Sequence, residues 1–175
     1  SVYEAQDFSK IPATPVRDSE GNWVLISLSL PGRELKARVW RVDVGRTELY
    51  LLDTDFEDNL PEDRQITHHL YGGDWENRIK QEYLLGIGGI LLLDKLGIKK
   101  DVYHCNEGHA ALIAAQRMAN LIQNEGLTFP QALEVVRSSS LYTCHTPVPA
   151  GHDYFEEGLF SKYMSHFPAK LGIEW

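Results

Sequence analysis

Two short stretches of sequence decide the fold of the second half of the chain: DVYHC at residues 101–105 and LYTC at residues 141–144. Both have the length and residue types of short strands. The segment between them has helical periodicity from His109 to about Asn124 and from Gln131 to about Arg137. The order strand, helix, helix, strand favours a parallel pair of strands joined by a crossover connection.

The sequence upstream of this segment follows two further patterns. Apolar and polar residues alternate from Trp23 to Leu52, which is typical of an antiparallel meander. Residues 74–97 have a helical period that Asp74 can cap. We expect little regular structure in residues 1–20, and a last helix from Asp153 towards Met164. The sequence therefore predicts one α/β domain over residues 1–175, with a β meander at 23–55 and an α/β part at 74–165.

The composition excludes several classes of protein. The 175 residues are 43% apolar and 24% charged, with a formal net charge of -8. This is ordinary for a folded domain, and a net acidic chain is a poor general binder of nucleic acid. No apolar run is long enough to cross a bilayer, two cysteines are too few for a disulfide framework, and the first residues show no secretory pattern. We expect a cytoplasmic protein without nucleic-acid or membrane partners.

The candidate site lies where the two expected strands end. Glu107 and His109 follow the first strand, and His145 follows the second. Because the carboxyl ends of parallel strands meet at one edge of a sheet, these loops should bound a common ligand crevice. His109 would begin a helix whose free amide groups favour anions or sugar hydroxyls, and Glu107 would add a carboxylate acceptor.

A zinc site is an alternative use of the same region. Cys105, His109, Cys144 and His145 form a chemically sufficient set of ligands. However, a Cys-x3-His pair and an adjacent Cys-His pair lack the usual spacing of structural zinc sites. We favour small, buried cysteines at strand ends over a metal centre.

The glycine-rich stretch at residues 86–89 has two interpretations. It begins like a nucleotide-binding loop, but Leu91 occupies the position of the third glycine and the segment lies inside a helical pattern. We therefore expect these glycines to let a buried helix pack closely against its neighbours.

Several blocks of sequence follow one another in a specific order. They are VWRVDVGR (39–46), LYLLDTD (49–55), LYGGD (70–74), RIKQE (78–82), LGIGG (85–89), NEGH (106–109) and HTPVPAGHD (145–153). Together they resemble the α-glucan (glycogen/maltodextrin) phosphorylase family in its shorter bacterial and archaeal branch. The resemblance extends from about Trp23 to Phe155, and several blocks in register are more specific than any single motif.

The resemblance implies that the chain is a fragment of the amino-terminal lobe of a two-lobed, Rossmann-like glycosyltransferase of the B type. Enzymes of this family phosphorolyse α-1,4-glucan to glucose 1-phosphate, and their pyridoxal phosphate acts through its phosphate group. The implied partners are α-1,4-glucan or maltodextrin, inorganic phosphate and the remaining lobes of the same enzyme.

The resemblance also implies roles for five substrate-binding residues. His145 resembles the histidine that lines the pocket of the transferred glucose, and Glu107 and His109 resemble the pair beside the anomeric face of that sugar. Arg78 resembles an arginine that reaches the same side pocket. Asp74 falls in the segment Gly72-Gly73-Asp74, where the family has a mobile gating loop. No catalytic residue and no metal ligand is implied for the fragment alone.

Two parts of the family's chemistry are missing from this sequence. The glycine-rich stretch that cradles phosphate and the lysine that attaches pyridoxal phosphate lie outside it, so we expect no bound cofactor and no activity of the isolated chain. One alternative is a freestanding carbohydrate-binding domain that stacks Trp23, Trp40, Trp75 or Tyr154 on sugar rings. A less favoured alternative is a small zinc protein. Apolar surface left by the missing lobes could pair two copies into a homodimer.

Overall fold

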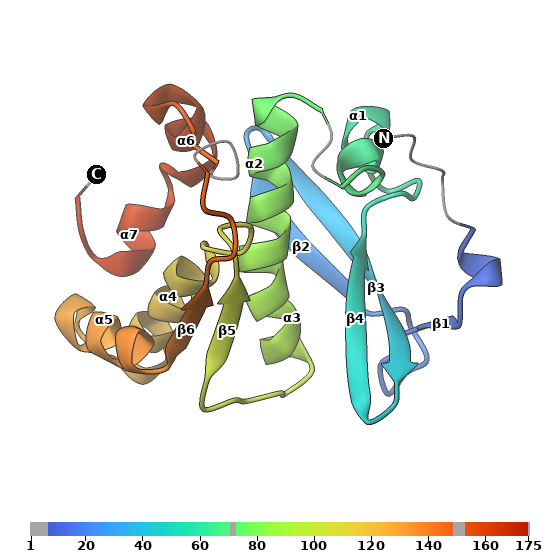
Figure 1. Cartoon of the computed structure of the whole chain (residues 1–175), viewed down its shortest axis with the longest axis horizontal. Coiled ribbons are helices and arrows are strands. Elements are labelled where there is room, and N and C mark those ends of the chain that lie inside the picture. The colour runs from blue at the N-terminus through green and yellow to red at the C-terminus, as the bar shows by residue number, and fades with distance from the viewer. Residues whose placement is uncertain (1–6, 71–72, 149–152, 175) are drawn as a thin grey trace. The chain divides into compact units, whose positions relative to one another are not determined.

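A computed structural model of the chain describes residues 7–70, 73–148 and 153–174 (Figure 1). It divides into two compact units, Ser1–Asn77 and Arg78–Trp175. The first unit contains a four-stranded sheet and the second a two-stranded sheet. Within the described ranges, no helix combines the length and apolar character that crossing a membrane requires. The assignment of residues 1–175 to one domain stays a prediction.

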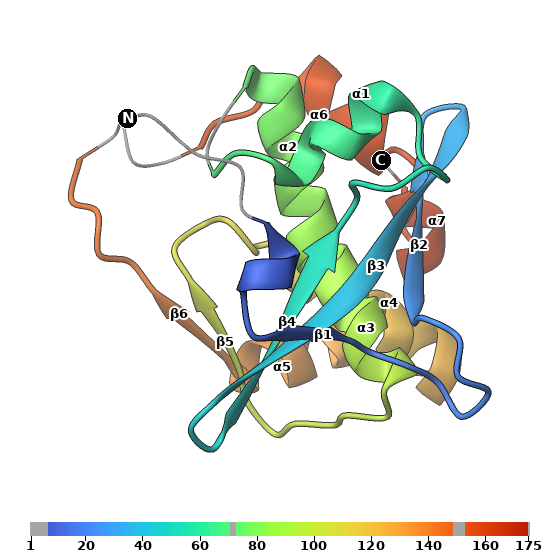
Figure 2. The same cartoon turned by 90° about the vertical axis from the view of Figure 1, so that its right-hand side faces the viewer.

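The first unit is built on an antiparallel sheet in which β3 lies between β2 and β4 (Figure 2). The long strand β3 (Arg33–Val44) pairs with β2 (Leu25–Leu30) on one edge and with β4 (Thr47–Asp53) on the other. Gly32 and Gly45 have φ values of 73° and 61° in the two connecting turns, a region that favours glycine. The antiparallel meander predicted from residues 23–52 is confirmed.

Alternate residues of β2 and β3 form the core of this unit. The side chains that are at most 5% exposed are Ile26, Leu28, Leu30, Leu35, Ala37 and Val39. Successive side chains of a strand point to opposite faces, so the period of two in the sequence places this whole set on one face. The burial of that face fixes the register, for example Leu28 opposite Leu35.

The amino-terminal segment is more regular than the sequence suggests. Phe8–Lys10 forms the 3-10 helix η1, and Ala13–Pro15 forms strand β1, which pairs with residues 40–42 of β3. The expectation of little regular structure before residue 20 is therefore wrong for β1. A strand of three residues has no detectable period of its own, and it forms because β3 extends beyond the end of β2.

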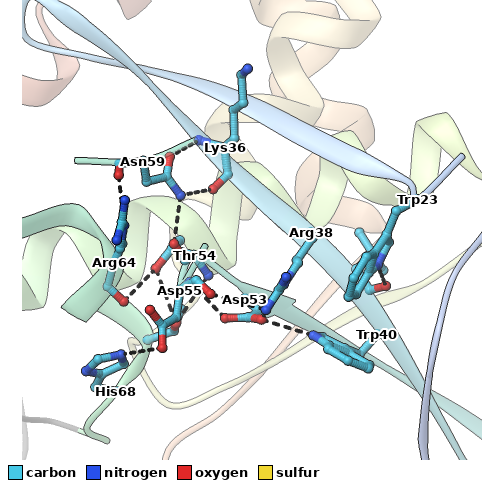
Figure 3. A network of polar contacts seen from close by, with 12 residues as sticks. Trp23, Lys36, Arg38, Trp40, Asp53, Thr54, Asp55, Asn59, Arg64 and His68 are labelled. Carbon is cyan, nitrogen blue, oxygen red and sulfur yellow. Dashed lines mark hydrogen bonds and ion pairs between the residues drawn. The ribbon is translucent and has the colours of Figure 1, made fainter. Parts of the chain in front are cut away.

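The loop after β4 is fastened to the sheet by polar side chains (Figure 3). It leads into α1 (Pro61–Arg64) and the 3-10 helix η2 (Gln65–Thr67). The Asn59 amide donates to the carbonyl oxygens of Lys36 and Thr54 at 2.7 Å each, and its oxygen accepts from the Lys36 backbone at 2.9 Å. Asp53 accepts hydrogen bonds from Arg38 at 2.8 Å and from the Trp40 indole at 3.1 Å. These bonds satisfy groups that would be costly to bury unpaired.

The second unit contains the parallel pair of strands. Strands β5 (Tyr103–Asn106) and β6 (Ser140–Thr143) pair in parallel, with Tyr103 opposite Ser140 and Asn106 opposite Thr143. Helices α4 (Ile113–Glu125) and α5 (Phe129–Ser138) form the connection between them. The α/β class and the predicted crossover are confirmed, whereas the Rossmann-like, B-type assignment stays a prediction.

The predicted helix over residues 74–97 consists of three consecutive segments. Helix α2 (Trp75–Tyr83) leads into the π-helical η3 (Leu84–Gly88) and then α3 (Gly89–Lys95). The chain leaves the helix at Gly97, where φ is 68°. A Cβ atom on Gly86 would lie 3.0 Å from the Cβ of Leu112, so close packing is confirmed there, whereas a Cβ atom on Gly89 would have no neighbour within 4 Å among the described residues.

Two predicted helix starts are wrong. Helix α4 begins at Ile113, not at His109, because a bend at residues 107–108 is followed by turns at residues 109–112, with hydrogen bonds such as Ala111 N–H to Gly108 O at 3.1 Å. Helix α6 (Glu157–Met164) begins four residues after Asp153, and a further short helix, α7 (Phe167–Leu171), follows it. A turn that precedes a helix lacks a sequence period, so the pattern alone does not separate the two.

Candidate functional site

The candidate site begins at the carboxyl ends of β5 and β6. Asn106 and Thr143 are opposite each other at the last pair of these parallel strands. The chain beyond Asn106 supplies Glu107 and His109, and the chain beyond Thr143 supplies His145. The predicted meeting of these two segments at one sheet edge is therefore confirmed.

Glu107 connects the two strand ends. Its carboxylate oxygen Oε1 accepts hydrogen bonds from the backbone amide of His145 at 2.8 Å and from the Thr146 hydroxyl at 3.2 Å. The amide of His145 is the main cause of a lowered pKa of the Glu107 carboxyl, and the Thr146 hydroxyl contributes in the same direction. Glu107 is thus held as a buried carboxylate, and its other oxygen, Oε2, is buried without a hydrogen-bond partner among the residues that the structure describes.

A second group of polar side chains surrounds Asp153. Arg78 of α2 forms an ion pair with Asp153, and His109 Nδ1 lies 3.8 Å from Asp153 Oδ2. Glu82 lies one helical turn after Arg78 and belongs to the same group. Glu82, His109 and Asp153 each offer one potential metal-ligand atom, and these three atoms lie within 4.8 Å of one another. The structure thereby brings together His109 and Arg78, two of the residues that the sequence predicts for the site.

Glu82 is the most perturbed acid of this group. Burial is the largest cause that raises its pKa to about 8, followed by a hydrogen bond with Asp153 and repulsion by that carboxylate, while Arg78 acts in the opposite direction. Two close carboxyl groups cannot both ionise cheaply. The raised pKa favours the protonated form of Glu82, which can donate a hydrogen bond.

A cavity of about 360 Å³ opens beside this group. It is lined by polar groups of Glu82, His109, Tyr142 and Asp153 and by the apolar or aromatic side chains of Ile79, Leu112, Tyr154, Phe155 and Phe160. Mostly apolar walls with a few convergent polar groups are typical of sites for small organic ligands.

The remaining predicted site residues have other positions. Asp74 belongs to the first unit and caps α2, where its Oδ1 accepts from the Asn77 amide at 2.8 Å, so the predicted cap is confirmed. Gly72 of the proposed gating segment lies outside the described residues. His145 and Glu107 contact each other, but neither is among the residues lining the cavity.

The structure does not assemble the zinc set considered above. In the parts of the chain that the structure describes, the group of three or more potential metal ligands is Glu82, His109 and Asp153, without a cysteine. The thiols of Cys105 and Cys144 instead donate to the carbonyl oxygens of Glu107 and Thr146. Cys105 is half-buried and Cys144 is exposed, so the expectation of buried cysteines is wrong for Cys144.

Sequence reasoning did not place Glu82, Asp153 or Asn106 in the site. Glu82 offered a signal, since it lies four residues after Arg78 in a helix that is otherwise apolar on its buried side. Asp153 offered none, because its contact with Arg78 joins residues 75 positions apart and depends on the tertiary fold.

The curated proteins that resemble this chain include several phosphorylases. The chain is 45% identical to a maltodextrin phosphorylase from Thermococcus litoralis over 95% of its own length and 20% of that protein. It is 42% identical to a glycogen phosphorylase from Mycobacterium tuberculosis over 94% of the chain and 20% of that protein. For a glycogen phosphorylase from Aquifex aeolicus the identity is 39%, over 94% of the chain and 24% of that protein. No family model matches the chain.

These relatives are phosphorylases by name, and the similarity covers nearly the whole of the present chain. The chain spans about a fifth of the length of the curated relatives it matches. It therefore corresponds to a fragment of the glycogen/maltodextrin phosphorylase family, as its sequence blocks predict.

Proposed function

We propose that the chain is part of an α-glucan phosphorylase and forms one wall of its glucosyl site. The observation that supports this most is the Glu107 carboxylate, which fixes the backbone of His145 at the sheet edge where the family resemblance expects the sugar. The nearby cavity, in which burial raises the pKa of Glu82, offers donors and acceptors that suit hydroxyl groups.

The five predicted residues have distinct roles in this proposal. His145 contacts the transferred glucose, and Glu107 and His109 line the pocket beside its anomeric face. Arg78 reaches the same side pocket of the sugar site, where its ion pair with Asp153 holds the guanidinium in place. Asp74, at the start of α2, belongs to the gating loop. The fold proposed for this part is the Rossmann-like amino-terminal lobe of a B-type glycosyltransferase.

The cavity in this chain does not fit pyridoxal phosphate. The described residues that line it include no lysine for the Schiff base and no arginine for the phosphate group, and the Asp153 carboxylate is unfavourable for a phosphate. We therefore assign no step to that cofactor here. In the proposal the remaining lobes of the enzyme hold it, together with inorganic phosphate.

The isolated chain should lack phosphorylase activity. Charge that develops on a glucosyl group needs opposing donors in a cleft that excludes water, and one wall does not provide them. The test compares the 175-residue chain with the longer protein that contains it, each incubated with maltoheptaose and inorganic phosphate. We expect glucose 1-phosphate only from the longer protein. Product from the chain alone would contradict its inactivity, and none from the longer protein would contradict the phosphorylase proposal.

A freestanding carbohydrate-binding domain is the second candidate. It is favoured by Tyr154, which is 73% exposed and lines the cavity, so that its ring is accessible for stacking on a sugar. Trp23 and Trp40 suit this role less well, because their indole N–H groups are bonded to Val39 O and Asp53. Calorimetric titration of the chain with maltooligosaccharides distinguishes the candidates: binding tighter than millimolar that Tyr154→Ala abolishes supports the binding domain.

The remaining partners and the location follow from the same proposal. A phosphorylase of α-1,4-glucan would work in the cytoplasm on maltodextrin. Large apolar side chains that are more than half exposed in the second unit include Leu85, Leu141 and Tyr142. We propose that this surface meets the remaining lobes, or pairs two chains in their absence.

A further inference from the structure

One face of the β5–β6 pair carries a row of polar side chains. His104 and Asn106 of β5 lie two residues apart and therefore point to the same face, as does Thr143 of β6, the partner of Asn106. His104 Nε2 lies 2.7 Å from the Thr143 hydroxyl. His145 continues this spacing beyond the end of β6, and its Nε2 lies 3.0 Å from Asn106 Oδ1. Both contacts are diagonal pairs between the neighbouring strands.

The backbone of His145 makes a hydrogen bond of its own, separate from that of the ring. Glu107 Oε1 accepts the His145 amide hydrogen at 2.8 Å, and the Glu107 amide in turn donates to Thr143 O at 2.7 Å. Glu107 reaches this position with a φ of 59°, a conformation that is uncommon for a residue with a side chain. Unfavourable backbone conformations persist where surrounding contacts hold them, and they cluster at functional sites.

His145 is thus held at two points by two consecutive residues of β5 and its exit loop. Asn106 contacts the ring and Glu107 contacts the backbone. An amide oxygen accepts a hydrogen bond but offers no proton, so its contact with Nε2 favours the tautomer in which Nε2 bears the hydrogen. The other ring nitrogen, Nδ1, is then an acceptor.

We propose that Asn106 is a positioning residue for His145: its amide oxygen holds the ring in the Nε2–H tautomer while Glu107 holds the backbone, so that Nδ1 accepts a hydrogen bond from a sugar hydroxyl. This inference rests on the proposed function for the identity of the hydroxyl donor. The hold on the ring itself depends only on the geometry of the chain.

The ring hold is tested by NMR of the full chain with 15N-labelled histidine at pH 8, above the ordinary pKa of histidine. In the unaltered chain, the two ring nitrogens of His145 should show the well-separated shifts of one Nε2–H tautomer. Asn106→Ala should bring these shifts towards each other, since a released ring exchanges between tautomers. Asn106→Asp should preserve the separation, because a carboxylate oxygen also accepts from Nε2.

A matched control uses the neighbouring pair on the same face. Thr143→Val removes the hydroxyl that contacts His104 and should change the ring signals of His104 but not those of His145. An Nδ1–H tautomer of His145 in the unaltered chain overturns the proposal. Ring shifts of His145 that stay the same in Asn106→Ala overturn it as well.

The consequence for the sugar is measured in the longer protein that contains this segment. Asn106→Ala should lower kcat/KM for maltoheptaose by about ten- to a hundredfold, the scale expected when a contact group is displaced by an ångström or less. An unchanged kcat/KM alongside a released ring overturns the positioning role. Absence of phosphorolysis in the unaltered protein contradicts the proposed function instead, and the NMR result for Asn106 is independent of it.

Discussion

Gly86 in the π-helical segment η3 packs directly against Leu112. A Cβ atom at position 86 would lie 3.0 Å from the Cβ of Leu112 and 3.1 Å from the backbone nitrogen of Ile113. Contacts of 3.0–3.2 Å are tighter than ordinary Cβ contacts, so the neighbouring atoms would have to move by a few tenths of an ångström, and overpacking of this kind costs stability. The absence of a side chain at Gly86 therefore sets how closely η3 approaches the start of α4.

We predict that Gly86→Ala lowers the free energy of unfolding by about 1–3 kcal/mol. Gly89→Ala is the matched control, because in the described part of the chain a Cβ there has no neighbour within 4 Å, and φ is -60°. The control should raise stability by about 0.5–1 kcal/mol through helix propensity. Urea unfolding of the two variants measures both values. Equal effects of the two substitutions would contradict the packing argument.

The ion pair of Arg33 with Asp63 should make a large contribution to the first unit. Arg33 Nε and Nη2 donate to the two oxygens of Asp63 at 2.6 and 2.7 Å, and the Asp63 side chain is 1% exposed. Asp63→Asn removes the buried charged partner and leaves Arg33 the longer, exposed contact with Glu62 at 3.5 Å, so it should cost about 2–3 kcal/mol. Asp43→Ala breaks the exposed pair with Arg41 and should cost less than about 1 kcal/mol in the same denaturant assay.

Glu82 should make stability fall with rising pH. Its pKa is raised from 4.5 to about 8, so the folded chain keeps a proton that the unfolded chain loses above pH 4.5. The contribution of Glu82 to the free energy of unfolding therefore declines between about pH 4.5 and pH 8 and does not change with pH below or above this range.

Glu82→Gln should remove this decline. A pKa shift of one unit corresponds to about 1.4 kcal/mol, and partial exposure of Glu82 reduces the effect, so we expect the variant to gain about 1–3 kcal/mol relative to the unaltered chain between pH 4 and pH 9. Glu134→Gln, an exposed glutamate of α5, is the control for loss of a charge and should show no such gain. Chemical unfolding at the two pH values provides the measurement, and parallel behaviour of both variants would refute the role of Glu82.

The capping box of α5 gives a fourth prediction. The Thr128 hydroxyl accepts from the Gln131 amide at 3.4 Å, and the Gln131 side chain accepts from the Thr128 amide at 3.0 Å. Thr128→Ala should lower the free energy of unfolding by about 1 kcal/mol. Gln131→Ala removes only the reciprocal bond and should have a smaller effect. Thermal unfolding measures both variants, and a thermal stability of Thr128→Ala equal to that of the unaltered chain would show that the cap does not stabilise α5.

Much of the fold was predictable because its signals are local. The alternation in β2 and β3 specifies which face is buried, and the order of strands and helices between residues 101 and 145 specifies a parallel pair. The errors occur where a local signal is weak. Strand β1 has three residues, and turns at residues 109–112 precede α4, which therefore begins after His109. Strand β1 forms because it pairs with β3, which is distant in the sequence. The hydrogen-bonded turns before α4 outweigh the helix propensity of the residues that form them.

The candidate site was also predictable only in part. The spacing of Glu107 and His145 beyond two strand ends was sufficient to predict that they meet. The sequence could not show that Asp153 joins Arg78 to His109, or that Asn106 contacts the ring of His145. Those contacts depend on the direction of individual side chains, which periodicity does not encode.

The sequence by itself determined the family fragment, the two kinds of sheet and the strand ends at which polar residues gather, because these follow from patterns of nearby residues and from blocks in a fixed order. Only the tertiary structure decided the raised pKa of Glu82 and the two hydrogen bonds that hold His145. A pKa depends on burial and on charges that arrive from remote parts of the chain, and a hydrogen bond depends on positions accurate to a few tenths of an ångström.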